Sequence, residues 1–475
     1  MKQYETVIGL EIHLETKTKS KMFSNGPVSF DASPNSSVVS LDLGEPGSLP
    51  TVNKEAVRNA LAMCVALHME IDPVLRFDRK NYFYADLPKG FQITQQEFPI
   101  GVGGYVTIHD EEGNPIKIAL ERLHMEEDTA KQIHFADYTL LDFNRAGTPL
   151  VEIVTKPVIK NGYEAMKYVE KIRAISQYLN VSDGKMEEGS LRCDVNISVR
   201  QIGQKELGTK VEIKNLNSIA NVKKAIDFET ERQIDIIENG GTVLQETRRY
   251  DESQRATVLM RMKTDAVDYK YFREGNILPI KISSHFILKV IRETPESPDR
   301  KYDRYRRVFG LSHLEAVKLL ENQALALYFD EISLLTSYFQ IASNFLKGEV
   351  CAYLNSNGMT FSELPISKEN LSYIFDLIGE RKISNKTARE LFIATIEGAN
   401  PHILYEQMKN NVIDEVELTI IINEILDSNK QSIDDFKAGR DRAFGFLVGQ
   451  IMKQTQGKAD PQLANRILKE QLQTR

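Results

Sequence analysis

The chain has 475 residues, which at roughly 150 residues per domain suggests about three domains. With 41% hydrophobic and 27% charged residues, its composition is that of a globular protein and excludes collagen-like, disordered and repeat-only chains. The 60 basic and 67 acidic residues give a formal net charge of −7, which excludes a basic field over the whole molecule but leaves local basic patches open.

The cysteines and the apolar stretches indicate the cellular compartment of the protein. The three cysteines lie far apart, without Cys-x-x-Cys spacing, and fit reduced thiols in the cytosol rather than a disulfide framework. The N-terminus lacks the pattern of a signal peptide, and the longest apolar stretches fall far short of the roughly 20 residues that cross a membrane. We therefore expect a cytoplasmic protein with no membrane contact.

The predicted helices define the organisation of the chain. Up to about residue 290, segments of period-2 alternation mix with helices over residues 54–69, 163–179 and 219–238, the first capped by Asn53. Beyond Ser297 helical spacing dominates, and turn-forming residues near 400 and 430 divide that region. The pattern predicts an α+β domain followed by helical domains, with a second boundary near residue 407.

Several predicted strands alternate apolar side chains with charged or imidazole side chains. Because successive side chains of a strand point to opposite faces, each strand would gather its polar set on one side. The strands span 7–15, 122–128, 191–199 and 210–214, and their polar faces carry Glu11, His13 and Glu15; Arg122, His124, Glu126 and Asp128; Arg192, Asp194, Asn196 and Ser198; and Lys210, Glu212 and Lys214.

Glu152 differs from these residues because aliphatic side chains surround it in the segment 150–154. A buried carboxylate needs a partner, whereas the other polar faces could also be the solvated side of an antiparallel sheet. Carboxylates with one imidazole suit a hard cation such as Mg²⁺, and nearby Arg and Lys side chains can hold phosphate. Metal-assisted phosphoryl transfer is the natural chemistry of such a set, and from the residues alone a solvated face stays open beside it.

Two further segments combine cations with aromatic rings. Residues 77–90 can stack a base and reach phosphates, or form an aromatic core strand followed by a solvated loop. Residues 297–307 carry five basic residues and two tyrosines, which favours a solvated helix face, with a contact to the RNA backbone as the alternative.

Taken together, eight segments in chain order resemble the B-subunit family of the aspartyl/glutamyl-tRNA(Asn/Gln) amidotransferases. The resemblance runs nearly from end to end, and the set is far more specific than any one of its members. The segments are VIGLEIH at 7–13, FDRKNYFYADLPKG at 77–90, RLHMEED at 122–128, NRAGTPLVEI at 144–153, KMEEGSLRCD at 185–194, EIKNLNS at 212–218, QETRR at 245–249 and FLVGQIMK at 446–453.

This resemblance implies the ATP-dependent kinase component of a glutamine-dependent amidotransferase. Such a component binds Glu-tRNA(Gln), and often Asp-tRNA(Asn), and phosphorylates the side-chain carboxylate of the attached amino acid. Ammonia from a separate amidase subunit (A) then displaces phosphate and yields Gln-tRNA(Gln) or Asn-tRNA(Asn), and a small subunit (C) ties the two together. The implied cofactors are ATP and Mg²⁺.

The resemblance also assigns site residues by motif position. It implies Glu11, His13, Glu126 and Glu152 as metal ligands and Lys80, Tyr82, Arg79 and Lys210 as nucleotide contacts. It implies catalytic roles for Glu126, Glu127, Arg192 and Asp194. Glu127 could also hydrogen-bond to a metal ligand without touching the metal, or act as an alternative ligand.

The implied fold is an α+β cradle domain, built on a largely antiparallel sheet over residues 1–293. An all-α helical domain (294–406) and a small α-helical tail domain (407–475) follow, and the resemblance implies that these contact the tRNA body.

The sequence departs from the family pattern near its N-terminus. Some members hold a structural zinc through two cysteine pairs, and the corresponding positions here are Ser24, Gly26, Val39 and Asp42. Since these residues do not form a zinc-binding set, we predict no zinc.

Two other functions remain open at this point. A stand-alone carboxylate–amine ligase could use the same metal site on a small acid, with ATP turnover independent of tRNA. A non-catalytic tRNA-binding scaffold would need no intact metal site, and the presence of Glu11, His13, Glu126 and Glu152 argues against it.

Overall fold

The computed structural model describes residues 3–29, 31–262, 268–410, 415–437, 441–455 and 459–474. The chain forms two compact units, Met1–Asp303 and Arg304–Arg475. The predicted division after residues 293 and 406 is finer than this one and stays a prediction.

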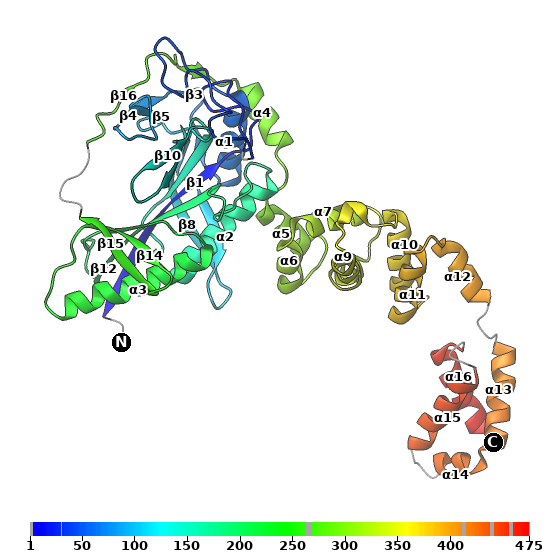
Figure 1. Ribbon diagram of the computed structural model, residues 1–475. Coiled ribbons are helices and arrows are strands. Elements are labelled where there is room, and N and C mark those ends of the chain that lie inside the picture. The colour runs from blue at the N-terminus through cyan, green and yellow to red at the C-terminus, as the bar shows by residue number, and fades with distance from the viewer. Residues whose placement is uncertain are drawn as a thin grey trace. The chain divides into compact units, whose positions relative to one another are not determined.

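The N-terminal unit is built on a sheet of ten strands in the order β15-β14-β13-β12-β1-β11-β8-β6-β2, with β7 also paired to β8 (Figure 1). Three smaller sheets are β10-β9, β16-β4-β5 and β17-β3. The strands are β1 Tyr4–Glu15, β2 Glu70–Ile71, β3 Val74–Leu75, β4 Asp78–Asn81, β5 Phe91–Thr94, β6 Gly101–Val102, β7 Tyr105–His109, β8 Pro115–Glu127, β9 Lys131–His134, β10 Thr139–Asp142, β11 Pro149–Thr155, β12 Leu191–Gln201, β13 Val211–Lys214, β14 Glu246–Asp251, β15 Ala256–Met262, β16 Phe272–Arg273 and β17 Ile280–Lys281.

Strand β1 lies in the middle of the large sheet, between β11 and β12, and pairs antiparallel with both. Among the named strand pairs, β13 with β14 is the parallel one. The predicted α+β domain on a largely antiparallel sheet is therefore confirmed.

One face of this sheet is apolar and packs against three helices. The helices are α1 (Lys54–Ala66), α2 (Gly162–Tyr178) and α3 (Ile219–Glu238), close to the three that periodicity predicts. The Asn53 side chain caps α1 by accepting hydrogen bonds from two backbone N–H groups of its first turn. The core that the helices close includes the aliphatic face of β1: Ile8, Leu10, Ile12 and Leu14.

The rest of the chain is helical, as the sequence predicts. The helices are α4 Ser284–Glu293, α5 Pro298–Arg307, α6 His313–Leu320, α7 Gln323–Ile332, α8 Phe339–Phe345, α9 Cys351–Asn357, α10 Lys368–Gly379, α11 Asn385–Ile396, α12 Pro401–Asn410, α13 Glu415–Ser428, α14 Lys430–Lys437, α15 Asp441–Gln454 and α16 Pro461–Thr474. A separate hydrophobic core joins α13 to α16. In the described residues, no helix is both long enough and apolar enough to span a bilayer.

Candidate metal and nucleotide site

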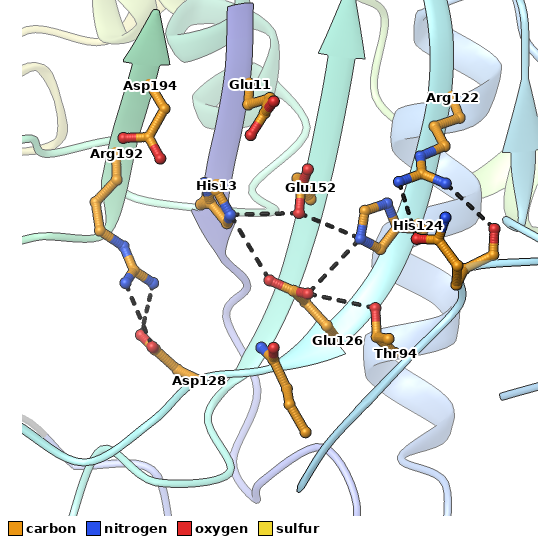
Figure 2. A network of polar contacts seen from close by, with 12 residues as sticks. Glu11, His13, Thr94, Arg122, His124, Glu126, Asp128, Glu152, Arg192 and Asp194 are labelled. Atoms are coloured by element: carbon orange, nitrogen blue, oxygen red, sulfur yellow. Dashed lines mark hydrogen bonds and ion pairs between the residues drawn. The ribbon is translucent and has the colours of Figure 1, made fainter. Parts of the chain in front are cut away.

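The second face of the large sheet carries a row of charged side chains, opposite the helices. The strand register brings them together, because His13 of β1 lies opposite Glu152 of β11, and Glu152 lies opposite His124 of β8. On the other side of β1, Glu11 lies opposite Asp194 and His13 opposite Arg192. The alternation predicted for each strand thus gives one continuous polar surface (Figure 2).

Two carboxylates and two imidazoles converge at the centre of this surface. The Glu152 Oε2 atom is 3.3 Å from Nε2 of His13 and 3.2 Å from Nε2 of His124. The Glu126 carboxylate approaches the same two nitrogen atoms at 3.8 Å and 3.6 Å. Thr94 adds a hydrogen bond from its hydroxyl to Glu126. Each carboxylate is therefore held between two rings (Figure 2).

Burial makes these contacts electrostatically strong. Burial alone would lower the pKa of His124, but Glu152 and Glu126 outweigh it and raise the pKa to about 9. The pKa of His13 is raised in the same way, against the effect of burial. Burial alone would raise the pKa of the Glu152 carboxyl, yet His124 and His13 hold it well below its usual range. When no metal is bound, the imidazoles and the carboxylates thus favour each other's charged forms.

The set His13, Glu126 and Glu152 fits a divalent cation. One potential ligand atom from each residue lies within 4.8 Å of the other two. Carboxylate oxygens with a single imidazole suit Mg²⁺ or Mn²⁺ better than a soft metal, which would call for thiolates. These three are among the residues that the resemblance implies as metal ligands.

Glu11, the fourth assigned ligand, lies beside this set. Its carboxylate accepts a hydrogen bond of 2.9 Å from the Asn196 side chain. Burial raises the pKa of Glu11, and the neighbouring charges of Glu152 and Asp194 raise it further. Glu11 is therefore close enough to be repelled by the neighbouring carboxylates, and a bound cation would reduce this repulsion.

A cation and several tyrosines face the same cluster from the small sheet β16-β4-β5. The Lys80 Nζ atom is 5.0 Å from the ring centre of Tyr269 and 5.8 Å from that of Tyr82. Burial lowers the pKa of Lys80, but Glu126 and the other anionic groups nearby outweigh it and leave the pKa raised. Lys80 and Tyr82 thus both lie near Glu126, and their assignment as nucleotide contacts stays a prediction.

Arg192 and Asp194, the assigned catalytic residues of β12, are both held by partners. The Arg192 guanidinium binds both oxygens of Asp128, at 2.6 Å and 3.3 Å. Asp194 forms an ion pair with Lys214, which lies on the neighbouring strand β13. The two ion pairs fix the orientation of these side chains beside the cluster, and Figure 2 shows the pair between Arg192 and Asp128.

Three assigned residues, Glu127, Arg79 and Lys210, lie away from the cluster, and their assigned roles stay predictions. Glu127 forms a buried ion pair with Lys89, 2.6 Å to its Oε2, and Arg79 pairs with Glu274. Because neighbouring side chains of a strand face opposite sides, Glu127 cannot point with Glu126, nor Arg79 with Lys80. Lys210 is exposed just before β13, whereas Lys214 of β13 pairs with Asp194.

Asp128, His124 and Lys214 contact assigned residues but are not themselves among the assignments. All three belong to the polar faces that alternation predicts, so the signal was present in the sequence. Tyr269 is different, because its ring contacts Lys80 although the two residues are 189 positions apart in the chain. The Asn81 side chain holds this segment in place by donating hydrogen bonds to the carbonyls of Tyr269 and Lys270. Local patterns carry no information on such a contact.

The positions that correspond to zinc ligands form a polar network around Asp42. The side-chain oxygens of Asp42 accept hydrogen bonds from Lys21 Nζ at 2.9 Å, Ser24 Oγ at 2.8 Å and the Val39 N–H at 3.1 Å. The Lys21 side chain is fully buried. Gly26 leaves room for this network, since a Cβ there would lie 2.7 Å from Asp42 Oδ2.

Glu15 and Asp128 form a buried carboxyl pair next to Arg192, and this pair predicts a pH effect. Burial, the charge of Asp128 and a hydrogen bond to it raise the pKa of Glu15 to about 8. The folded state therefore binds a proton that the unfolded state releases above about pH 4.5, so stability falls as pH rises toward 8. We expect Glu15→Gln, which mimics the protonated group, to remove this loss.

The measurement is the free energy of unfolding of both proteins from urea titrations at pH 6 and pH 9. At the higher pH, the free energy of unfolding of the variant should exceed that of the parent by on the order of 2 kcal/mol. An equal pH dependence in both proteins would contradict the prediction.

Comparison with known proteins decides the family. Residues 6–288 match the family described as the GatB/GatE catalytic domain, and residues 327–472 match the one described as the GatB domain. The chain belongs to the GatB/GatE family. The catalytic-domain match contains the residues of the cluster, and the resemblance drawn from the eight segments is confirmed.

Full-length relatives agree with this assignment to the GatB/GatE family. Proteins from Macrococcus caseolyticus, Oceanobacillus iheyensis and Staphylococcus saprophyticus are 47%, 46% and 46% identical to the chain. Each alignment covers 99% of this chain and 100% of the relative. All three relatives are named as the B subunit of the aspartyl/glutamyl-tRNA(Asn/Gln) amidotransferase.

Proposed function

We propose that this chain is the tRNA-binding, ATP-dependent kinase subunit of a glutamine-dependent amidotransferase. Its substrates are Glu-tRNA(Gln), Asp-tRNA(Asn) or both, and its partners are an amidase subunit and a small third subunit in the cytoplasm. The observation that carries the proposal is the convergence of His13, Glu126 and Glu152, with Lys80 beside them, in a member of the GatB/GatE family.

The chemistry explains why a kinase site is needed. A carboxylate cannot expel oxide, so ammonia cannot displace it directly. An oxygen of the substrate carboxylate attacks the γ-phosphorus of ATP, the bond to the bridging oxygen breaks, and ADP leaves. Ammonia then attacks the acyl carbon and the bond to phosphate breaks. The departing phosphate takes the proton that the nitrogen loses, so the products are the amide and inorganic phosphate.

Both steps bring anions together, and the site supplies positive charge to offset their repulsion. His13, Glu126 and Glu152, with Glu11 adjacent, would hold Mg²⁺, which neutralises the phosphate charge that builds up during transfer. Lys80 adds a fixed cation on the same side, and the rings of Tyr82 and Tyr269 next to it can pack against the nucleotide.

Arg192 and Asp194 border the cluster across β1, where the substrate carboxylate would approach. The bidentate bond to Asp128 holds the Arg192 guanidinium in one orientation, so little ordering is left for the reaction. An oriented guanidinium can bind a carboxylate or the transferring phosphoryl group. We assign it to positioning the substrate.

The dependence of ATP turnover on charged tRNA tests the proposal. The chain is assembled with its amidase and small partner subunits, Mg²⁺, ATP and glutamine, and phosphate release is measured. Glu-tRNA(Gln) should stimulate release strongly, whereas uncharged tRNA(Gln) and free glutamate should not. Stimulation by free glutamate alone would favour a small-acid ligase, and tRNA binding without any turnover would favour a scaffold.

A further inference from the structure

The hairpin formed by β9 and β10 projects an apolar face with no other strand beside it in the described residues. The two strands pair with each other as a separate sheet, with Leu140 opposite Ile133. Beyond that pair, the Phe135 N–H bonds to the Tyr138 carbonyl at 2.8 Å, and the two rings stack with centres 4.7 Å apart. Strand alternation therefore puts Ile133, Phe135, Tyr138 and Leu140 on one side, which we call the apolar hairpin face.

All four side chains of the apolar hairpin face are exposed, by 39%, 50%, 58% and 51% in that order. The opposite face is mostly polar, and there His134 and Thr139 share a side-chain hydrogen bond of 2.9 Å. An isolated two-stranded hairpin is marginal in water, and a contiguous exposed apolar patch marks a binding surface more often than chance.

The base of the hairpin is fixed to the rest of the unit. Asp142 accepts hydrogen bonds from the backbone N–H groups of Asn35 and Asn144, both at 3.0 Å. The Arg145 side chain binds the carbonyls of Thr129 and Ala130 at the other strand. The apolar hairpin face is thus presented in a defined position, so a partner would lose little free energy in ordering it.

The position of the hairpin links it to the candidate site. It is inserted between β8 and β11, the strands that carry Glu126 and Glu152. At its base, the Gly147 N–H binds the Asp128 carbonyl at 2.9 Å, and Asp128 holds Arg192. A protein bound to the hairpin would therefore lie next to the cluster.

The charge of the hairpin selects the kind of partner. Residues 131–142 contain Lys131 as the one Lys or Arg, against Asp137 and Asp142. Nucleic acid is held by several cations that contact phosphates, and this segment does not provide them. An apolar, aromatic face with a weakly acidic rim suits an apolar patch on another protein.

We propose that the apolar hairpin face docks the protein that supplies ammonia. The inference rests on the proposed function, because an amidation site without its own ammonia source needs one delivered nearby. Ammonia released into neutral water is protonated and loses the lone pair that attacks the acyl phosphate. A supplier fastened beside the site shortens that path. Four side chains are fewer than a stable interface contains, so the hairpin is an anchor within a larger contact.

The test compares two double variants of the full-length chain. Phe135→Ser/Leu140→Ser removes half of the apolar hairpin face. The matched control, Ile202→Ser/Leu207→Ser, removes two aliphatic side chains that are 60% and 55% exposed beyond β12. Exposed substitutions change stability little, and thermal melting of both variants verifies it.

The hairpin variant should bind the purified amidase subunit at least about tenfold more weakly than the control, as expected for a buried aromatic anchor. Glutamine-dependent amidation should fall at subsaturating amidase, whereas tRNA-dependent phosphate release and amidation from added ammonium salt should stay at the control level. Those last two readouts test the proposed function separately, because they need no docked supplier.

Three results would overturn the proposal. Unchanged affinity for the amidase subunit would mean that the hairpin does not anchor it. Loss of tRNA affinity in the hairpin variant would make RNA the occupant. A dimer of the parent chain that the variant loses, with amidase binding intact, would make a second copy of the chain the occupant.

Discussion

The Glu152→Gln variant is expected to lose about a thousandfold of the rate of amide formation while keeping its fold. Glu152 lies 3.3 Å and 3.2 Å from the two imidazoles and supplies one of the two central carboxylates. A neutral amide of the same shape binds a divalent cation weakly and leaves phosphate charge unbalanced, and losses of this size follow removal of one charge-stabilising group.

The measurement is the single-turnover rate of Gln-tRNA(Gln) formation at saturating ATP and Mg²⁺, with thermal melting as the check on folding. Glu5→Gln is the matched control, because Glu5 lies on the same face of β1 as His13 but pairs with Arg200 near the start of the strand. This partly exposed ion pair lies away from the cluster, so the rate of amide formation should stay within about twofold of the parent. A Glu152→Gln rate within about tenfold of the parent would refute the metal assignment.

The second large effect is on stability. We expect Asp42→Ala to lower the free energy of unfolding of the N-terminal unit by about 3–5 kcal/mol, because it leaves the buried Lys21 ammonium without its carboxylate. What remains for Lys21 is a hydrogen bond of 3.3 Å to the Phe143 carbonyl. Burial already lowers the pKa of Lys21 despite Asp42, which shows how costly the charge is.

The double variant Lys21→Met/Asp42→Leu is the informative partner in this experiment. It replaces both charges by apolar groups of similar size, and such exchanges are often neutral or stabilising. Urea unfolding of the single and double variants should therefore show recovery of most of the lost stability. If Asp42→Ala costs less than about 1 kcal/mol, the ion pair does not hold this loop together.

Much of the site could be predicted because strand alternation is a local property. Within β1 and β8 the sequence places Glu11 and His13, or His124 and Glu126, on one face, and the structure does the same. The same rule separates Glu127 from Glu126, which motif position alone does not reveal. A motif identifies the segment that carries the site. Which side chains of that segment can reach a ligand depends on the alternation of side chains along the strand.

What could not be predicted is which strands are neighbours. Strand β1 lies between β11 and β12, well over a hundred residues away, and that choice depends on core packing rather than on any local signal. The contact between Lys214 and Asp194 follows from the same register, because Val195 of β12 pairs with Ile213 of β13. The buried Lys21–Asp42 pair is likewise a product of tertiary contacts between loops.

Labelling with oxygen isotopes tests the phosphorylation of the substrate carboxylate most directly. Glu-tRNA(Gln) is prepared with ¹⁸O in both side-chain carboxyl oxygens and converted by the assembled enzyme with ATP, Mg²⁺ and glutamine, and the released phosphate is analysed by mass spectrometry. Phosphorylation of the carboxylate predicts one ¹⁸O atom in each phosphate and one left in the amide. Phosphate without label, formed alongside Gln-tRNA(Gln), would contradict the acyl-phosphate route and the kinase role of the site.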